Sequence, residues 1–213
     1  MNKFTSILLS AVLFLMNNPL KAQDSAESLV QRTAAKLEKD GGITMNLSIT
    51  VRDGFKTDIR EVTFDMSGDS FRSTDDENTI WFDGKTLWRG SDFGSGIEEI
   101  YISEPLADEA ARFNLIRMLK EHEGFSVTGN GHDTFTLTAS DNGSSIAGIS
   151  SITVKVDPAT NVIRRAYISF SEETGDMKAD ISVLQYSPGK KFDGKTFKCP
   201  VKEYKDADII DLR

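Results

Sequence analysis

The sequence predicts a mainly β (α+β) fold, in which about eleven antiparallel strands form one large sheet accompanied by a few helices. Three observations lead to this prediction. Long stretches of the chain alternate apolar and polar residues, turn signals separate these stretches, and only two segments show helical spacing. Sheets of this size curl, so we expect a barrel or half-barrel. No linker of different composition divides the chain, which indicates a single domain.

The N-terminus has the layout of a secretory signal peptide. Lys3 gives it a basic start, and an apolar run from Phe4 to Met16 follows that is too short to span a bilayer. We expect cleavage near Ala22, so residues 1–22 form the signal peptide and residues 23–213 the exported domain. The removed segment contains no cysteine to carry a lipid anchor. The expected product is exported and free.

Charge and cysteine content exclude several classes of protein. The net charge of −8 argues against a nucleic-acid partner and against binding to anionic lipid through a polybasic segment. The single cysteine, Cys199, rules out an intramolecular disulfide framework, and we expect it to be a buried structural thiol. Stability must then come from packing.

A helix is predicted to open the exported domain. Asp24 with Glu27 three residues later resembles a capping box, and Gly41 with Gly42 provides a stop signal. The residues between them that share one apolar stripe are Leu29, Val30, Thr33, Ala34 and Leu37.

The first two strands follow this helix. Residues 43–52 alternate strictly, with Ile43, Met45, Leu47, Ile49 and Val51 on one face. Asp53 and Gly54 turn the chain into a second strand at 55–66. Its apolar residues change from odd to even positions between Ile59 and Val62, which predicts a bulge.

The rest of the chain is predicted to be mostly strand. One interruption, residues 103–124, reads as two short helices with a break near Asn114, because its apolar residues lie on two different stripes. The strand-like runs are 70–73, 79–82, 85–89, 97–102, 125–129, 134–139, 149–156, 162–170, 177–186, 195–199 and 208–212.

The segment TIWFDGKTLW, residues 79–88, predicts a hairpin with Asp83 and Gly84 as a two-residue turn. Alternation then places Trp81 and Trp88 on one face and Ile80, Phe82 and Leu87 on the other, so both faces are apolar. Long alternating strands, an amphipathic helix and a split apolar helix pair together suit a sheet with a hydrophobic lining under a helical cover. Such a cavity would hold an apolar ligand.

Signals of catalysis or metal binding are few. His122 and His132 lie near Glu121, Glu123 and Asp133, but their spacing is not that of a zinc site. No serine elbow, HExxH motif or cysteine with a plausible base is present. The pentapeptide FDGKT occurs at 82–86 and 192–196, which we interpret as shared turn chemistry rather than a duplicated domain.

On these features the chain resembles the LolA family of periplasmic carriers, which escort lipoproteins from the inner to the outer membrane. The resemblance rests on the N-terminal helix, the DGKTLW hairpin at 83–88, the strand and helical segment that follow, and the closing DADIIDLR, which is similar to the ending of LolA-like proteins from Bacteroidetes. Phe71 and Arg72 match the aromatic-arginine part of the family pattern. Ser67 and Gly68 stand where family members often carry Arg-Pro, the arginine of a lid latch.

The resemblance implies an unclosed antiparallel barrel of about eleven strands with a helical lid. It implies a periplasmic, non-enzymatic carrier without cofactor or metal, a monomer that binds acyl chains and no nucleic acid. Its implied partners are acylated lipoproteins, the inner-membrane lipoprotein release complex and a possible outer-membrane acceptor. The expected lid residues are Leu115, Ile116 and Leu119, and the expected lipid-binding cavity wall is Leu47, Ile49, Val62, Phe64, Phe71, Ile80, Phe82 and Trp88.

Two alternatives to the carrier stay open at this point. A lipid or glycolipid binding module, or an envelope sensor, fits the same half-barrel. An enzyme built on a carboxylate pair is a third interpretation, which hydrolase screening with His122 and His132 replaced would detect. The sequence does not determine which of the two alternating sets of strand residues faces inward.

Overall fold

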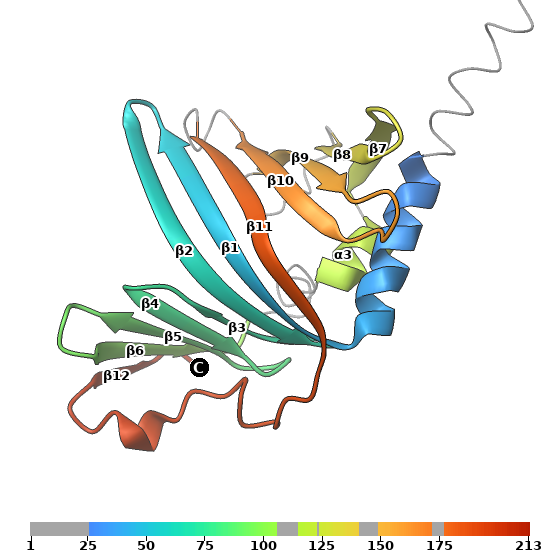
Figure 1. Cartoon of the computed structure of the whole chain (residues 1–213). Coiled ribbons are helices and arrows are strands. Elements are labelled where there is room, and N and C mark those ends of the chain that lie inside the picture. Colours follow the sequence, from blue (N-terminus) through green and yellow to red (C-terminus); the bar gives the residue numbers. More distant parts are fainter. Residues whose placement is uncertain (1–25, 106–114, 123, 141–148, 172–176) are drawn as a thin grey trace, which may run out of the picture.

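The computed structural model describes residues 26–105, 115–122, 124–140, 149–171 and 177–213. These residues form one sheet of twelve strands in the order β12-β6-β5-β4-β3-β2-β1-β11-β10-β9-β8-β7. The outermost strands, β12 and β7, have no partner on their outer sides among the described residues, so the sheet curls without closing (Figure 1). Neighbouring strands are antiparallel except β12, which runs parallel to β6. The predicted unclosed β fold is confirmed, with one strand more than expected.

The strands are β1 (Gly42–Asp53), β2 (Lys56–Ser67), β3 (Ser70–Thr74), β4 (Asn78–Phe82), β5 (Leu87–Asp92), β6 (Ile97–Ser103), β7 (Phe125–Gly129), β8 (Thr134–Ala139), β9 (Ile149–Val156), β10 (Ile163–Phe170), β11 (Met177–Lys190) and β12 (Asp208–Asp211). The described helices are the N-terminal helix over residues 26–40 and α3 (Leu115–Glu121). A 3₁₀ turn lies at Val201–Glu203.

The N-terminal helix forms where the sequence predicts it. Its predicted stripe, Leu29 to Leu37, is buried, and the hydroxyl of Thr33 donates to the carbonyl of Leu29 at 2.8 Å, which satisfies the buried polar group. The helix ends at residue 40, followed by Gly41 with φ of +67°. Glycine adopts this conformation without strain, so the predicted stop is confirmed. The proposed capping residue Asp24 lies outside the described residues.

The predicted bulge in the second strand is wrong. The β1–β2 register runs without interruption from Ile43 opposite Met66 to Asp53 opposite Lys56. The apolar residues change from odd to even positions because Ile59 lies on the opposite face from Val62, where its side chain is 66% exposed. Irregularities in the register occur instead between β1 and β11, near Ile43 and near Leu47.

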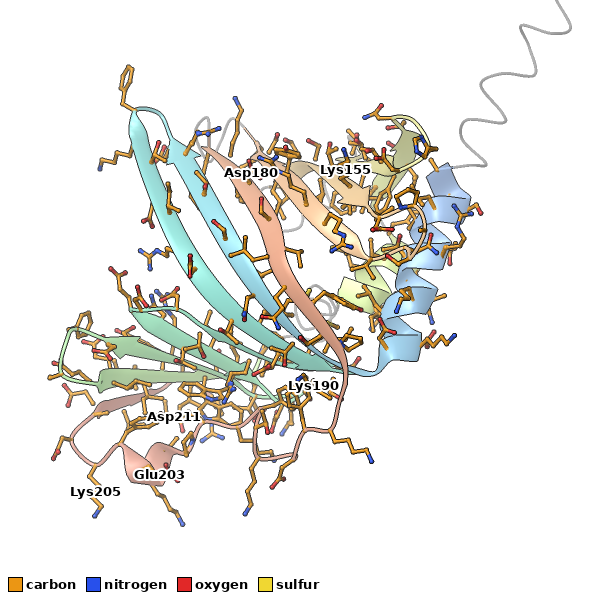
Figure 2. The ribbon with its side chains drawn as sticks, in the orientation of Figure 1. Lys155, Asp180, Lys190, Glu203, Lys205 and Asp211 are labelled. Atoms are coloured by element: carbon orange, nitrogen blue, oxygen red, sulfur yellow. The ribbon has the colours of Figure 1, made fainter. Side chains whose placement is uncertain are left out.

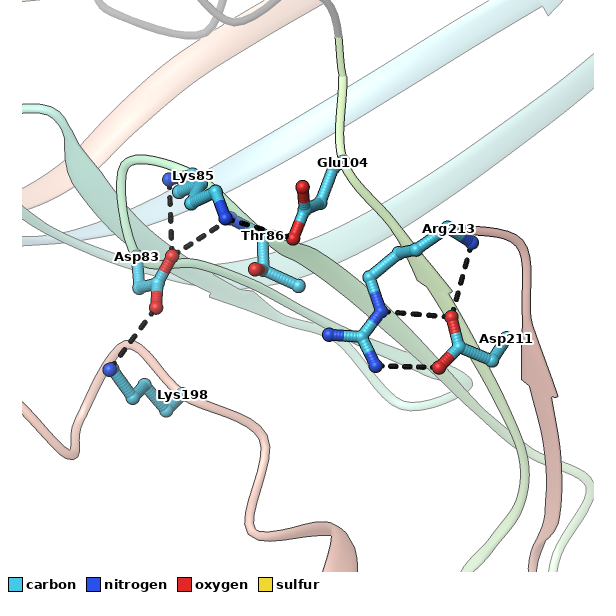
Figure 3. Close-up of polar contacts among 7 residues, drawn as sticks. All are labelled: Asp83, Lys85, Thr86, Glu104, Lys198, Asp211 and Arg213. Atoms are coloured by element: carbon cyan, nitrogen blue, oxygen red, sulfur yellow. Dashed lines mark hydrogen bonds and ion pairs between the residues drawn. The ribbon is translucent and has the colours of Figure 1, made fainter.

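The predicted two-residue turn at Asp83 and Gly84 is also wrong. Phe82 pairs with Leu87, so the loop has four residues. The Asp83 carboxylate accepts hydrogen bonds from the backbone N–H groups of Lys85 at 3.1 Å and Thr86 at 2.9 Å (Figure 3). In the second FDGKT, Asp193 accepts from the N–H of Lys195 at 3.1 Å, so the two segments share this aspartate-to-backbone hydrogen bond, but of the two glycines only Gly84 has a positive φ.

The C-terminal segment forms a covering layer rather than the predicted strand at 195–199. Residues 191–200 contain no strand, and in Figure 1 the segment after β11 passes beneath β3–β6. Lys198 reaches Asp83 at 3.3 Å, which joins this segment to the β4–β5 loop (Figure 3). The predicted final strand is confirmed as β12, and the N–H of Leu212 donates to the carbonyl of Ile102 beside it at 2.8 Å.

Two predicted segments fall partly or wholly outside the described residues. The signal peptide, residues 1–22, is one of them. The first of the two predicted short helices and the break near Asn114 fall in residues 106–114, which are not described, whereas α3 forms at the place of the second. No helix in the described ranges is long and apolar enough to cross a membrane.

Candidate functional site

The two faces of the sheet differ sharply in chemistry. The inner face is the one that packs against the N-terminal helix and α3, and the outer face is its reverse. Because directly paired residues point to the same side, the registers assign each strand residue to a face. The inner face carries apolar residues on nearly every strand: Val127, Leu137, Ile152, Ala166, Ile181, Ile49, Met45, Phe64, Phe71, Phe82 and Leu87.

The outer face over the central strands is polar. Thr136 and Thr153 share a hydrogen bond at 2.9 Å across β8 and β9. Arg165 of β10 forms a bidentate pair with Asp180 of β11, at 2.8 Å for Nε, and these hydrogen bonds hold the pKa of Asp180 below its usual range. Figure 2 labels Asp180 on β11. Over the central strands the sheet therefore has one wetted and one apolar side, and the apolar side is the candidate binding surface.

The two described helices cover only part of the inner face. The N-terminal helix and α3 lie beside β7–β9 in Figure 1 and share one core with that end of the sheet. Leu37 and Leu119 from the helices and Phe135 from β8 are at most 1% exposed. This is the packed end of the inner face, and it accounts for the stability of the fold.

Burial decreases along β1 away from the helices. Ile43 and Met45 are 0% and 5% exposed, whereas Leu47, Ile49 and Val51 are only half-buried. Leu47 still touches the core, but Ile49 and Val51 lie beyond it. Among the described residues the inner face thus continues as a partly uncovered apolar surface, which is the arrangement that a hydrophobic ligand site needs.

Seven of the eight predicted cavity-wall residues share the inner face. An aromatic row crosses it, with Phe64 and Phe71 ring centroids 5.6 Å apart and Phe71 and Phe82 also 5.6 Å apart. Val62, Phe71 and Phe82 are buried. The half-buried members are Leu47, Ile49, Phe64 and Ile80.

The assignment of Trp88 to the cavity wall is wrong. It pairs with Trp81, so both tryptophans lie on the outer face, opposite Ile80 and Phe82. There they pack with Ile100, Ile102 and the C-terminal segment, including Cys199 and Tyr204. A Cβ atom added at Gly90 would lie 2.9 Å from the side chain of Ile97, so a larger residue there would force Ile97 to shift within this cluster.

This second cluster explains why both faces of the β4–β5 hairpin are apolar. One face belongs to the inner surface, and the C-terminal segment covers the other. Cys199 is buried, as predicted, and burial raises the pKa of its thiol to about 12. A thiol with so high a pKa stays protonated and unreactive at neutral pH.

The three predicted lid residues differ in what the structure shows of them. Leu119 is fully buried in the core, and Ile116 is half-buried against it. The side chain of Leu115 lies outside the described residues. On its exposed side α3 contacts the N-terminal helix through Lys120 and Glu38, 2.7 Å apart. His122, the residue after α3, lies 3.4 Å from Glu27 of the same helix. An exposed ion pair such as Lys120–Glu38 contributes little, so Leu119 is the main anchor of α3.

The N-terminal helix is tied to the sheet at its C-terminal end. The hydroxyl of Tyr186 on β11 donates to Asp40 at 2.5 Å, and the Lys36 ammonium lies against the same carboxylate. Burial alone would raise the pKa of Asp40, but the hydrogen bonds from Lys36 and Tyr186 outweigh it and lower the pKa. Burial and this hydrogen bond raise the pKa of Tyr186. Sequence reasoning missed this contact because the two residues are far apart in the chain.

Arg72, part of the resemblance to the family's latch region, lies on the outer face. Its guanidinium donates to Asp65 at 2.7 Å, and Thr44 donates to the other oxygen of that carboxylate at 2.6 Å. The Asp65 side chain is only 5% exposed. Arg72 therefore neutralises a buried carboxylate on the side of the sheet away from the helices.

The inner face becomes polar at its far end, over β2 and β4–β6. A pocket of about 1000 Å³ lies there, and Arg60 crosses it to Glu77 at 2.7 Å. The apolar surface is thus bounded by the helices at one end and by charged groups at the other. The pocket is lined by Arg60, Asp76, Glu77, Asn78, Arg89, Ser91, Asp92, Phe93, Gly94, Glu99 and Tyr101.

The described residues hold no cluster of three or more His, Cys, Asp or Glu side chains arranged to bind a metal. His122 follows α3 and lies against Glu27, whereas His132 is in the β7–β8 turn next to Asp133. The structure therefore does not bring the two histidines together with a common set of carboxylates.

Comparisons with known proteins agree with this geometry. A search of curated proteins finds no match. Among solved structures, an uncharacterized conserved protein from Thermus thermophilus has a TM-score of 0.50 at 12% identity, over 85% of this chain and 98% of that one, and supports the fold. A LolA superfamily protein from Nitrosomonas europaea has a TM-score of 0.43 at 10% identity, over 83% and 98% of the two chains.

A third solved structure, the MucA/MucB complex of Pseudomonas aeruginosa, has a TM-score of 0.43 at 12% identity, over 83% of this chain and 62% of that one. The sequence itself matches a family model. The model is that of the outer membrane lipoprotein carrier protein LolA, and it matches residues 19–155. Since this match covers well over half of the sequence, the chain belongs to the LolA family of outer membrane lipoprotein carrier proteins.

Proposed function

We propose that this protein is a periplasmic carrier that holds the acyl chains of lipoproteins against the inner face of its sheet and escorts them to the outer membrane. The observation that carries the proposal is the partly uncovered apolar surface of the inner face, from Leu47 to Val51 on β1 and across to Ile181 on β11. Membership of the LolA family supports it. No covalent chemistry is needed for this function.

Partial cover suits a carrier that must also release its cargo. Burial of one methylene is worth about 0.8 kcal/mol, so a sixteen-carbon chain gains roughly 12 kcal/mol when fully buried. Full burial of several chains would make release too slow. A site that leaves apolar residues such as Leu47 and Ile49 half-buried binds the chains less tightly, so the cargo can pass to an acceptor.

Our proposal assigns each predicted group a role. Leu47, Ile49, Val62, Phe64, Phe71, Ile80 and Phe82 form the wall of the site, and Trp88 no longer belongs to it. Leu115, Ile116 and Leu119 belong to the lid. Residues 1–22 direct export to the periplasm, where the monomer receives acylated lipoproteins from an inner-membrane release complex and passes them to an outer-membrane acceptor.

Protein purified from the native host tests the chemical class of the cargo. We expect triacylated lipoprotein to co-purify with the wild-type chain, because its acyl chains match the uncovered part of the inner face. Mass spectrometry of the bound material identifies it. Free phospholipid or glycolipid as the sole occupant would contradict the carrier proposal and favour a lipid-binding module or sensor.

A further inference from the structure

The β1–β2 hairpin ends in a fully exposed aromatic side chain. Asp53 pairs with Lys56, so Gly54 and Phe55 form a two-residue turn. Gly54 has φ of +56°, a conformation that glycine favours at the first central position of such turns. Phe55 takes the second position and is 109% exposed, so it rests on no other part of the described protein.

The hairpin presents this side chain at a protruding end of the sheet. Strand β3 pairs only with Thr63–Ser67 of β2, so residues 56–62 continue past it with no strand beside that edge among the described residues. At about 3.3 Å per residue this extension is roughly 20 Å long. In Figure 1 the turn between β1 and β2 lies at the end of the sheet farthest from β3–β6 and β12.

Two cations flank Phe55 at the tip. Arg52 and Lys56 are exposed; Lys56 lies opposite Asp53, and Arg52 is near enough to Asp180 to help lower the pKa of that carboxyl. With Asp53 included, the tip from Arg52 to Lys56 has a formal charge of +1 in a chain whose net charge is −8. An aromatic ring beside cationic side chains is the combination that settles at the boundary between lipid headgroups and acyl chains.

The apolar part of the inner face leads toward this tip. Val51 lies two residues before the turn, and Ile49 and Leu47 follow it toward the core on the same side of β1. On this side the charged pair Asp53 and Lys56 borders the turn, and Val51 belongs to the next inner-facing pair. An acyl chain that leaves a membrane at the tip would therefore pass one charged pair before it meets the apolar residues of β1.

We propose that this tip, Arg52 to Lys56, touches the surface of a phospholipid membrane during loading or delivery, with Phe55 inserted at the headgroup level. The proposed carrier function gives this contact its purpose, but its test is independent of cargo binding. One aromatic ring and two cations give weak and reversible attachment, which a protein that moves between two membranes requires.

Flotation with vesicles of equimolar phosphatidylethanolamine and phosphatidylglycerol tests the contact. We expect the full-length exported protein to float with the vesicles, and Phe55→Ser to weaken that binding about tenfold. Arg52→Gln and Lys56→Gln should each weaken it about fivefold, and added salt should weaken it further. Leu184→Ser is the matched control, because Leu184 is 59% exposed on β11 but lies far along the strand from the tip.

A fluorescent diacylglycerol separates this proposal from the carrier proposal. Phe55→Ser should bind that probe as the wild type does, because Phe55 lies outside the proposed site. Equal flotation of Phe55→Ser and wild type, or no flotation of a wild-type protein that binds the probe, would overturn the membrane contact and leave the carrier proposal standing. Flotation without probe binding would support the contact and overturn the carrier proposal.

Discussion

Replacing Ile49 by lysine is expected to weaken the binding of an uncharged acyl ligand about tenfold or more, because an ammonium under an acyl chain loses water without gaining a partner. Ile49 is half-buried on the inner face, between Ile181 of β11 and Arg60 of β2. An acidic substitute would pair with Arg60, whereas lysine cannot. Titration of the protein with a fluorescent diacylglycerol measures the effect.

The same substitution at Ile59 provides the matched control. Ile59 is one strand away on the opposite face, where it pairs with Thr50 and is 66% exposed. Ile59→Lys should bind the ligand as the wild type does. Both variants should keep a nearly unchanged melting temperature, since neither residue belongs to the fully buried core. Equal affinity of the two variants would show that the inner face is not the binding surface.

Replacing Arg72 by leucine is expected to lower the free energy of unfolding by about 3 kcal/mol, because it strands the Asp65 carboxylate in a buried position. The Asp65 side chain is 5% exposed and would keep only its hydrogen bond from Thr44. Urea unfolding followed by tryptophan fluorescence measures the change. Adding Asp65→Asn to the same variant should recover part of the loss, since the buried charge is then gone.

Arg165→Leu is the control for this effect. Arg165 also spans two strands to an aspartate on the outer face, but the Asp180 side chain is 19% exposed and water can replace part of the lost contact. We expect a loss of about 1 kcal/mol or less. A loss at Arg72 no larger than that at Arg165 would mean that Asp65 does not depend on its partner.

Local patterns in the sequence predicted most of the fold. The stripe from Leu29 to Leu37 and the alternation from Ile43 to Val51 each identify an element by its periodicity, and both elements form as predicted. These signals are local, because the period depends only on the backbone geometry of a helix or strand. The strands at 125–129, 134–139 and 149–156 were predicted at their observed bounds for the same reason.

The errors arise where distant segments decide the outcome. The run at 195–199 looks like a strand, but it packs over Trp81 and Trp88 instead of joining the sheet. Ile59 looks like a core residue after a bulge, but the register with β1 leaves it exposed. The four-residue loop at 83–86 replaces a tight turn because Asp83 bonds to the backbone and to Lys198.

The site could be predicted only in part. Family resemblance and alternation indicated which residues share a face, but not which face lies inward, and Trp88 was consequently assigned to the wrong surface. The inner residues of β10 and β11, such as Ala166 and Ile181, were also missed. Their alternation was visible in the sequence, but only the pairing of β11 with β1 shows that they continue the same surface.

Depletion of the protein in its native host tests the carrier function most directly. Lipoproteins destined for the outer membrane should accumulate in the inner membrane when the protein is removed, and fractionation with lipoprotein-specific antibodies would detect them. Expression of the wild type or of Ile59→Lys should restore their location, whereas Ile49→Lys should not. Lipoproteins that reach the outer membrane normally in the depleted cells would contradict the proposed role.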